Sequence, residues 1–155
     1  SQINRNASDV KQYFSKDNFL IWFNQDKKSL LSKMADVLSG GESYNFKDSL
    51  LHGIQQREEL SSVVFSEKIA VPHPIQALGT EVKIAVAICK DPLLWDDQNS
   101  NVQLVFLLSP SIYGNEGLTD VTKRIVSLTE KEDLQNQLIA CNNFEDFMKI
   151  FENVT

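Results

Sequence analysis

Several features that mark particular classes of protein are scarce or missing in this sequence. The 155 residues include two cysteines, two histidines and four prolines, and no apolar run approaches the ~20 residues that a membrane-spanning helix requires. The 15 Lys and Arg residues are outnumbered by 21 Asp and Glu residues, which gives a formal net charge of −6. Direct contact with nucleic acid or an anionic membrane is therefore disfavoured, because it needs a face rich in Lys and Arg. No secretory leader is visible, so we expect a cytoplasmic protein that does not insert into membranes.

Signatures of cofactor and metal chemistry are also missing. Cys89 and Cys141 lie far apart and form no C-x-x-C pair, so we interpret them as reduced, buried thiols. Zinc needs three or four His, Cys or carboxylate ligands at close spacing, and no cysteine lies near His73. There is no P-loop, no G-x-G-x-x-G and no G-x-S-x-G, so nothing indicates a nucleotide site or a serine triad. We expect neither a cofactor nor a metal.

We interpret the chain as one domain with a short lead-in. Residues 1–12 are polar and lack periodicity, which is typical of a linker or a disordered segment. Residues 13–155 are long enough for a single domain with its own core, and no internal repeat is visible. The first residue is serine rather than methionine, so we expect that the chain was cut from a longer protein or carries a cloning scar.

Apolar runs and helical periodicity alternate along the domain. The runs VKIAVAIC and VQLVFLL are almost continuously apolar, as in strands that are covered on both faces. Apolar residues at three- and four-residue spacing predict helices before and after them. The predicted strands are 18–23, 63–65, 69–71, 82–89 and 102–108, with a loop over 90–101, and the predicted helices start near residues 27, 46, 118, 132 and 144. This order predicts an α/β domain of three layers, a mixed sheet of approximately five strands flanked by helices on both faces.

One histidine stands between two prolines. In EKIAVPHPIQ, residues 67–76, a short apolar run ends at Pro72-His73-Pro74. The prolines fix the backbone on either side of His73 and remove two donors. The run before them delivers the ring to the end of a sheet, where α/β domains place ligand sites. Such an imidazole can act as a base, a metal ligand or a phosphoryl acceptor; the alternative is an ordinary histidine in a turn. His52 is predicted to be a boundary residue in mid-helix.

Arg57 is the second candidate. It lies near the end of the second predicted helix, in the sequence QREE. An arginine there can interact with the carbonyl groups at the helix C-terminus, which is a structural role. It can also present its planar guanidinium to a phosphoryl group. The residues alone leave both roles open.

The segment from Arg57 to His73 resembles a known active site. REELSSVVFSEKIAVPH is similar to the active-site segment of enzyme IIA domains of the mannitol–fructose class, which belong to the bacterial phosphoenolpyruvate-dependent sugar phosphotransferase system (PTS). The shared pattern is an R-E pair, a short variable stretch and an apolar run that ends in [IV]-A-[IV]-P-H. The resemblance extends over roughly residues 10–153 and implies a mixed sheet flanked by helices.

This resemblance also implies roles for four residues. His73 would be the phosphoryl acceptor, phosphorylated by the carrier protein HPr or by an enzyme IIB. Arg57 would be the basic residue beside it and would compensate the charge of the incoming phosphoryl group, since phosphoryl transfer depends mostly on positioning and charge compensation. Ser61 and Ser62 would offer supporting hydroxyl groups. The sequence does not indicate which nitrogen of His73 reacts.

The sequence departs from transport members of the class at two places. Those members often carry a second histidine in a motif like N-E-H-[IL], where this chain reads Asn115-Glu116-Gly117-Leu118. Glycine supplies no donor to steady the phosphoryl group, which puts onward transfer to a sugar-specific IIB in doubt. Transport members also tend to read P-H-G, where this chain has Pro74 after His73.

The P-H-P sequence, followed by a loop with Trp95 and then by VQLVFLLSP, resembles the enzyme IIA-like domains at the C-termini of PTS-controlled transcriptional regulators. In that setting phosphorylation of His73 is a signal, because an added charge of about −1.5 to −2 alters contacts with other domains of the same chain. We therefore expect a regulatory module that does not touch nucleic acid itself. The alternatives are a transport phosphocarrier from HPr to a fructose- or mannitol-type IIB, and a degenerate interaction module that is never phosphorylated.

Overall fold

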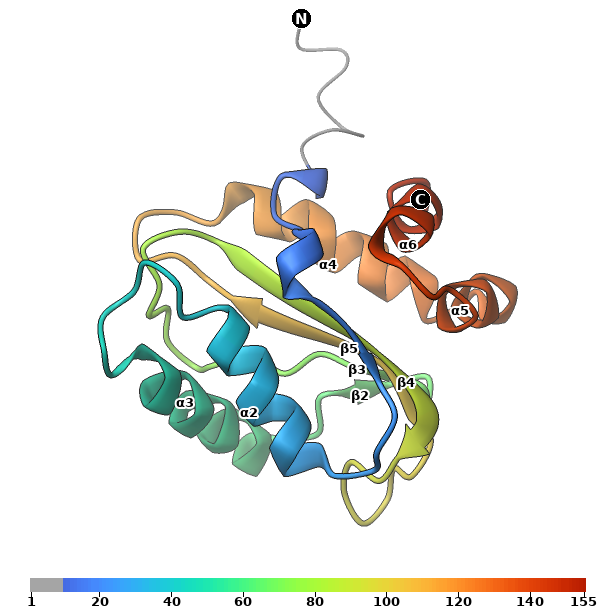
Figure 1. The fold of residues 1–155 in the computed structure, drawn as a ribbon, viewed down its shortest axis with the longest axis horizontal. Helices are drawn as coiled ribbons and strands as arrows, with labels where there is room; N and C mark the ends of the chain where they lie inside the picture. Colours follow the sequence, from blue (N-terminus) through green and yellow to red (C-terminus); the bar gives the residue numbers. More distant parts are fainter. Residues whose placement is uncertain (1–9) are drawn as a thin grey trace, which may run out of the picture.

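A mixed five-stranded sheet is the middle layer of the computed structural model, which describes residues 10–155 (Figure 1). The strands are β1 (Phe19–Trp22), β2 (Val64–Phe65), β3 (Ile69–Ala70), β4 (Lys83–Leu93) and β5 (Val102–Ser109), in the spatial order β1-β4-β5-β3-β2. β1 pairs with β4 and β3 pairs with β5 in parallel, whereas β4 with β5 and β2 with β3 are antiparallel. The predicted mixed sheet is confirmed.

Helices cover both faces of this sheet. They are the short 3-10 helix η2 (Lys16–Asn18) and the α-helices α2 (Lys27–Val37), α3 (Phe46–Leu60), α4 (Glu116–Leu128), α5 (Glu132–Ile139) and α6 (Phe144–Phe151). Figure 1 shows α2 and α3 on one face of the sheet, with α4, α5 and α6 on the other. The three-layer α/β architecture predicted from the sequence is therefore confirmed. Most of the predicted lead-in, residues 1–9, lies outside the described residues, and Val10 is fully buried ahead of the boundary predicted at residue 13.

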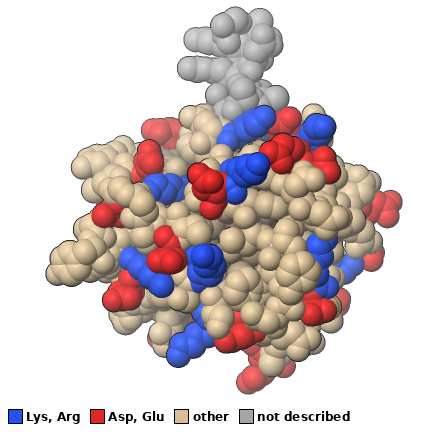
Figure 2. Space-filling model, viewed as in Figure 1, with Lys and Arg blue, Asp and Glu red and all other residues tan. Residues whose placement is uncertain are grey.

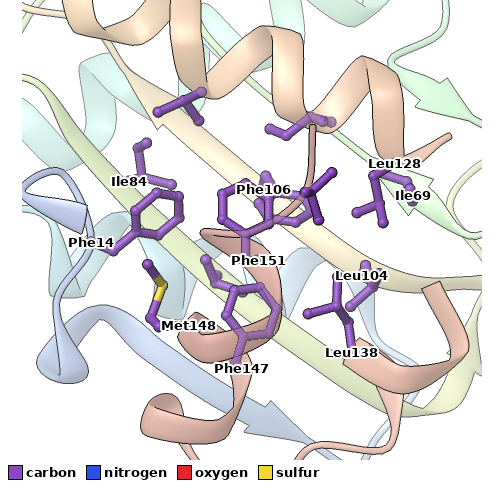
Figure 3. Packing of buried hydrophobic residues seen from close by; sticks show 14 of the residues in the cluster. Phe14, Ile69, Ile84, Leu104, Phe106, Leu128, Leu138, Phe147, Met148 and Phe151 are labelled. Carbon is purple, nitrogen blue, oxygen red and sulfur yellow. The ribbon is translucent and has the colours of Figure 1, made fainter. Parts of the chain in front are cut away.

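The strand residues alternate between two hydrophobic cores, which explains the continuously apolar runs. In β4 the residues of the core under α4, α5 and α6 are Ile84, Val86 and Ile88, and those of the core under α2 and α3 are Ala85, Ala87 and Cys89. The first core also holds a group of aromatic rings (Figure 3). Phe106 of β5 lies 5.4 Å from Phe151 of α6, ring centroid to centroid, and Phe14 lies 5.2 Å from the same ring. The chain before β1 is thus part of this core.

β4 is longer than the sequence predicts. It runs on through Lys90 to Leu93, although this stretch was predicted to be a loop. Its pairing with β5 shifts register between Ile88 and Leu93. Pro92 lies in this irregular part, where a residue without an N–H group is tolerated.

Because β3 and β5 are parallel, their C-terminal ends lie side by side, next to the candidate site. Both strands end there, β3 before Pro72 and β5 at Ser109. The two segments stay joined beyond β3, because the Leu108 N–H donates to the Pro72 carbonyl oxygen at 3.0 Å. The residue that follows Pro72 is therefore fixed to the central sheet.

A three-residue turn over 66–68 joins β2 to β3, since Phe65 pairs with Ile69. Two of its residues, Ser66 and Glu67, have φ angles of 56° and 65°, in the left-handed region. Three-residue loops are common hairpin connections and include a residue in this region. The buried Gln135 of α5 supports the turn by donating to Ser66 Oγ at 3.3 Å and to the Leu128 carbonyl oxygen at 2.9 Å. The turn thus fixes how the chain passes from α3 into β3.

Candidate functional site

The ring of His73 is held in one tautomer. Its Nδ1 lies 2.8 Å from the carbonyl oxygen of Val71. A carbonyl oxygen can only accept a hydrogen bond, so Nδ1 carries the proton and donates it. In the neutral ring this leaves Nε2 with its lone pair free. The sequence alone does not indicate which nitrogen is free, whereas this contact does.

His73 borders an apolar hollow between the edge of the sheet and α4. The hollow has a volume of about 270 Å³. It is lined by Phe65, Val71, His73, Leu108, Pro110, Leu118, Thr122, Ile125, Val126 and Thr129. The two threonine hydroxyls are engaged within α4, since Thr122 donates to the Leu118 carbonyl oxygen and Thr129 to that of Val126. Phe65 is 44% exposed and Val126 57% exposed, so the half-buried imidazole lies beside an open surface of low polarity.

Arg57 lies in the last turn of α3, as predicted, and its guanidinium is bound to Ser61. One of its terminal nitrogens donates to the Ser61 carbonyl oxygen at 2.9 Å and to Ser61 Oγ at 3.1 Å. Ser62 accepts from the Val64 N–H at 3.1 Å, at the entry to β2. The structure therefore brings Arg57 and Ser61 together at the helix end. None of these hydrogen bonds is to His73.

Glu58, the second residue of the R-E pair, anchors the same helical turn. Its Oε1 accepts from Lys27 Nζ of α2 at 3.1 Å and from Trp95 Nε1, in the loop after β4, at 2.6 Å. The ammonium group of Lys27 also lies 4.5 Å from the centroid of the Trp95 ring, within the range of a cation–π contact. Sequence reasoning missed this cluster, because the three residues are remote from one another along the chain. The cluster holds in place the helical turn that carries Arg57.

Gly117 occupies the position at which transport members of the class often carry a second histidine. Tyr13 fills the space beside Gly117. A Cβ atom added at Gly117 would overlap the Tyr13 hydroxyl oxygen and two atoms of its ring. No side chain fits at position 117 while Tyr13 keeps this position. The sequence showed the glycine but not its neighbour.

The remaining candidates, His52 and the two cysteines, do not line the hollow beside His73. His52 is exposed on α3. Cys89 is fully buried, and burial raises the pKa of its thiol to about 12. Burial also raises the pKa of the Cys141 thiol. Both cysteines are free and buried, as predicted.

Two further features are absent from residues 10–155. No group of three or more His, Cys, Asp and Glu side chains there is placed to hold a metal ion. No helix in the same residues is long and apolar enough to cross a bilayer.

Comparisons with known proteins assign this chain to a family. The family described as "Phosphoenolpyruvate-dependent sugar phosphotransferase system, EIIA 2" matches residues 12–154. Two curated relatives come from Bacillus subtilis (strain 168). The "Probable licABCH operon regulator" is 26% identical over 144 residues, 92% of this chain and 22% of the relative. The "PTS system fructose-specific EIIABC component" is 24% identical over 127 residues, 81% of this chain and 20% of the relative. The chain thus spans about a fifth of the length of these proteins.

The fold also matches a solved structure. In the complex of enzyme IIAMTL and phosphorylated enzyme IIBMTL from Escherichia coli, the matched chain superposes with a TM-score of 0.69 at 14% identity. The match covers 89% of this chain and 96% of that chain. At this identity the likeness concerns the fold.

Proposed function

The chain belongs to the EIIA 2 family of the phosphoenolpyruvate-dependent sugar phosphotransferase system, and from this premise we propose that it carries a phosphoryl group on Nε2 of His73. The observation that carries the proposal is the hydrogen bond from Nδ1 to the Val71 carbonyl oxygen, at 2.8 Å. It leaves Nε2 as the nucleophile and holds the ring in a fixed orientation. The donor would be HPr or an enzyme IIB.

The proposed step needs no general base. Nε2 attacks the phosphorus in line, the bond from phosphorus to the phosphorylated atom of the donor breaks, and its electron pair returns to that atom. The proton on Nδ1 of His73 stays in place, hydrogen-bonded to Val71. Rate enhancement then rests on positioning and on compensation of the phosphoryl charge.

Arg57 is the residue that we propose for this compensation. It follows Gly53 by four residues in α3, so the two share a face of the helix. Gly53 lies against Pro74, the residue after His73. The Arg57 guanidinium has five N–H groups, and one of its nitrogens already bonds to Ser61. The other N–H groups are available to phosphoryl oxygens, with the Ser61 and Ser62 hydroxyls as supporting donors.

The apolar hollow beside His73 is the docking surface that fits a protein donor. Its rim carries the exposed side chains Phe65 and Val126, and interface centres are typically apolar. The E. coli mannitol IIA domain of the same fold is known in complex with phosphorylated IIB. We propose that HPr or a IIB docks here. On the face seen in Figure 2, basic and acidic side chains are interspersed without a large basic patch, which supports a protein partner over nucleic acid.

We further propose that phosphorylation serves regulation and that the domain works in the bacterial cytoplasm. The operon regulator among the relatives matches over 92% of this chain. Gly117 with Tyr13 leaves no room for a second histidine, which disfavours fast onward transfer. The phosphoryl charge would change contacts with other domains of a longer regulator, for which residues 13–155 would be the enzyme IIA-like unit. The fructose-specific EIIABC relative keeps a transport role as the second candidate.

A phosphorylation assay tests both levels of the proposal. The chain is incubated with phosphoenolpyruvate, enzyme I and HPr, or with a phosphorylated IIB, and intact mass is measured before and after mild acid. We expect one acid-labile phosphoryl group, which His73→Ala loses and His52→Ala keeps. Phosphate retained in His73→Ala, or no uptake from either donor, would contradict the proposal. Rapid return of the group to a fructose- or mannitol-type IIB would favour transport.

A further inference from the structure

A glycine lies where the middle of α3 passes the Pro-His-Pro loop. Gly53 is buried, and a Cβ atom added to it would lie 2.8 Å from Cβ of Pro74 and 3.4 Å from its Cα. The first distance is far inside van der Waals contact. The Pro74 Cβ belongs to a ring that is closed on the backbone, so it cannot swing aside as the end of a long side chain would. Helix interiors disfavour glycine, and this close approach explains its presence.

The contact fixes the backbone of His73 from its C-terminal side. On the N-terminal side, the Pro72 carbonyl oxygen accepts from the Leu108 N–H of β5 at 3.0 Å. On the other side, Pro74 is buried against α3 at Gly53. The imidazole therefore stands between two attachments, one to the sheet and one to the helix that carries Arg57.

We propose that Gly53 is a positioning residue for phosphoryl transfer and forms a matched pair with Pro74. This rests on the proposed function of His73. By letting the proline ring reach α3, Gly53 sets the position of the His73 ring relative to Arg57, one helical turn further along the same face. Pro74 is also the residue at which this chain departs from the P-H-G of transport members, and a ring at that position requires the missing side chain at position 53.

A cycle of four proteins tests the pair: wild type, Gly53→Ala, Pro74→Gly and the double variant. Gly53→Ala moves the loop outward, and we expect the initial rate of His73 phosphorylation to fall about tenfold, because displacements near 1 Å can cost up to ~100-fold. Pro74→Gly frees the backbone and lowers the rate by a smaller factor. In the double variant the 2.8 Å contact is gone and the nearest remaining atom is the Cα at 3.4 Å. Its rate is expected to return to that of Pro74→Gly.

Two further measurements separate positioning from folding. Gly40→Ala is the matched control, because a Cβ there meets nothing within 4 Å; it should leave the rate unchanged. Imidazole nitrogen NMR reports the tautomer of His73 without any phosphoryl donor. We expect the Nδ1–H form in the wild type and a mixture of tautomers in Gly53→Ala, with the single form restored in the double variant.

The results separate a failure of the proposed function from a failure of the Gly53–Pro74 pair. A wild-type protein that takes up no phosphate refutes the proposed function and this inference together. A phosphorylated wild type with an equally fast Gly53→Ala variant, or a double variant as slow as Gly53→Ala, overturns only the matched pair. If Gly53→Ala does not fold, the double variant decides: recovery of the fold and of the Nδ1–H form supports the contact, and lack of recovery refutes it.

Discussion

Replacement of Glu58 by alanine removes the acceptor on which two side chains converge. Its side chain is 20% exposed, and its carboxylate accepts from Lys27 Nζ at 3.1 Å and from Trp95 Nε1 at 2.6 Å. In Glu58→Ala the ammonium group of Lys27, whose side chain is 27% exposed, can turn to water. The indole N–H of Trp95 cannot do so easily, because that residue is only 3% exposed. The main cost is therefore a buried donor without a partner.

The size of this effect follows from the two contacts. A hydrogen bond to a charged group contributes about 1.5–3 kcal/mol, and an unsatisfied buried donor costs about 1–3 kcal/mol. Because these terms overlap, we expect Glu58→Ala to lower the free energy of unfolding by about 3 kcal/mol. With a urea m-value of about 2 kcal/mol/M, the midpoint moves down by about 1.5 M. Glu58→Gln keeps an acceptor for Trp95 and should lose only about 1 kcal/mol.

Urea unfolding followed by far-UV circular dichroism measures this shift. Glu59→Ala is the matched control, since Glu59 is the exposed neighbour in the same helical turn, and it should cost no more than about 0.5 kcal/mol. In a Trp95→Phe background no donor is left unpaired, so Glu58→Ala should cost only about 1 kcal/mol. An unchanged midpoint in Glu58→Ala, or the same loss in both backgrounds, would refute the reasoning.

Three further predictions concern the site and the core. Arg57→Ala should slow phosphorylation of His73 about 100-fold. It should cost about 1 kcal/mol of stability or less, because the hydrogen bonds from Arg57 to Ser61 are exposed. Rate assays and melting curves check this, and a loss of stability without a loss of rate would assign the arginine a structural role at the helix end. Gly117→Ala should destabilise by about 1–3 kcal/mol, since its Cβ would meet Tyr13, yet stabilise in a Tyr13→Ala background; equal effects on the melting temperature in both backgrounds would contradict this. Cys89 should resist iodoacetamide at pH 8 in the native protein and react in urea, because burial raises the pKa of its thiol to about 12. The stability that this pKa shift contributes is complete below the unfolded pKa of about 8.5 and is lost as pH rises towards 12. Alkylation of the native protein at pH 8 would contradict this prediction.

Local sequence patterns predicted the helices and strands, whereas the surroundings of His73 and Arg57 depend on contacts between residues that are far apart in the sequence. The apolar runs of β4 and β5 identified the central strands, since burial on both faces leaves a signature in consecutive residues. The end of β4 was missed, because Asp91 and Pro92 disfavour a regular strand and only the pairing with β5 extends it. His73 and Arg57 followed from the motif that carries them.

The partners of those two residues were beyond prediction from the sequence. Glu58 meets Trp95 across 37 residues, and Gly53 meets Pro74 only in the folded chain. A glycine in a helix is a visible signal of close approach, but the sequence does not say what approaches. The same holds for Tyr13 beside Gly117.

The short turn between β2 and β3 makes the length of the chain between Arg57 and His73 a constraint of its own. The end of α3, β2, the three-residue turn and β3 follow one another there, with only residues 61–63 and 71–72 as connections. One inserted residue would shift β3 by one place along β5 and turn Ile69 from one core to the other. It would also change the length of chain that connects α3, which carries Arg57, to the loop that carries His73. Relatives that keep this site are therefore expected to differ here in the identity of residues and not in their number.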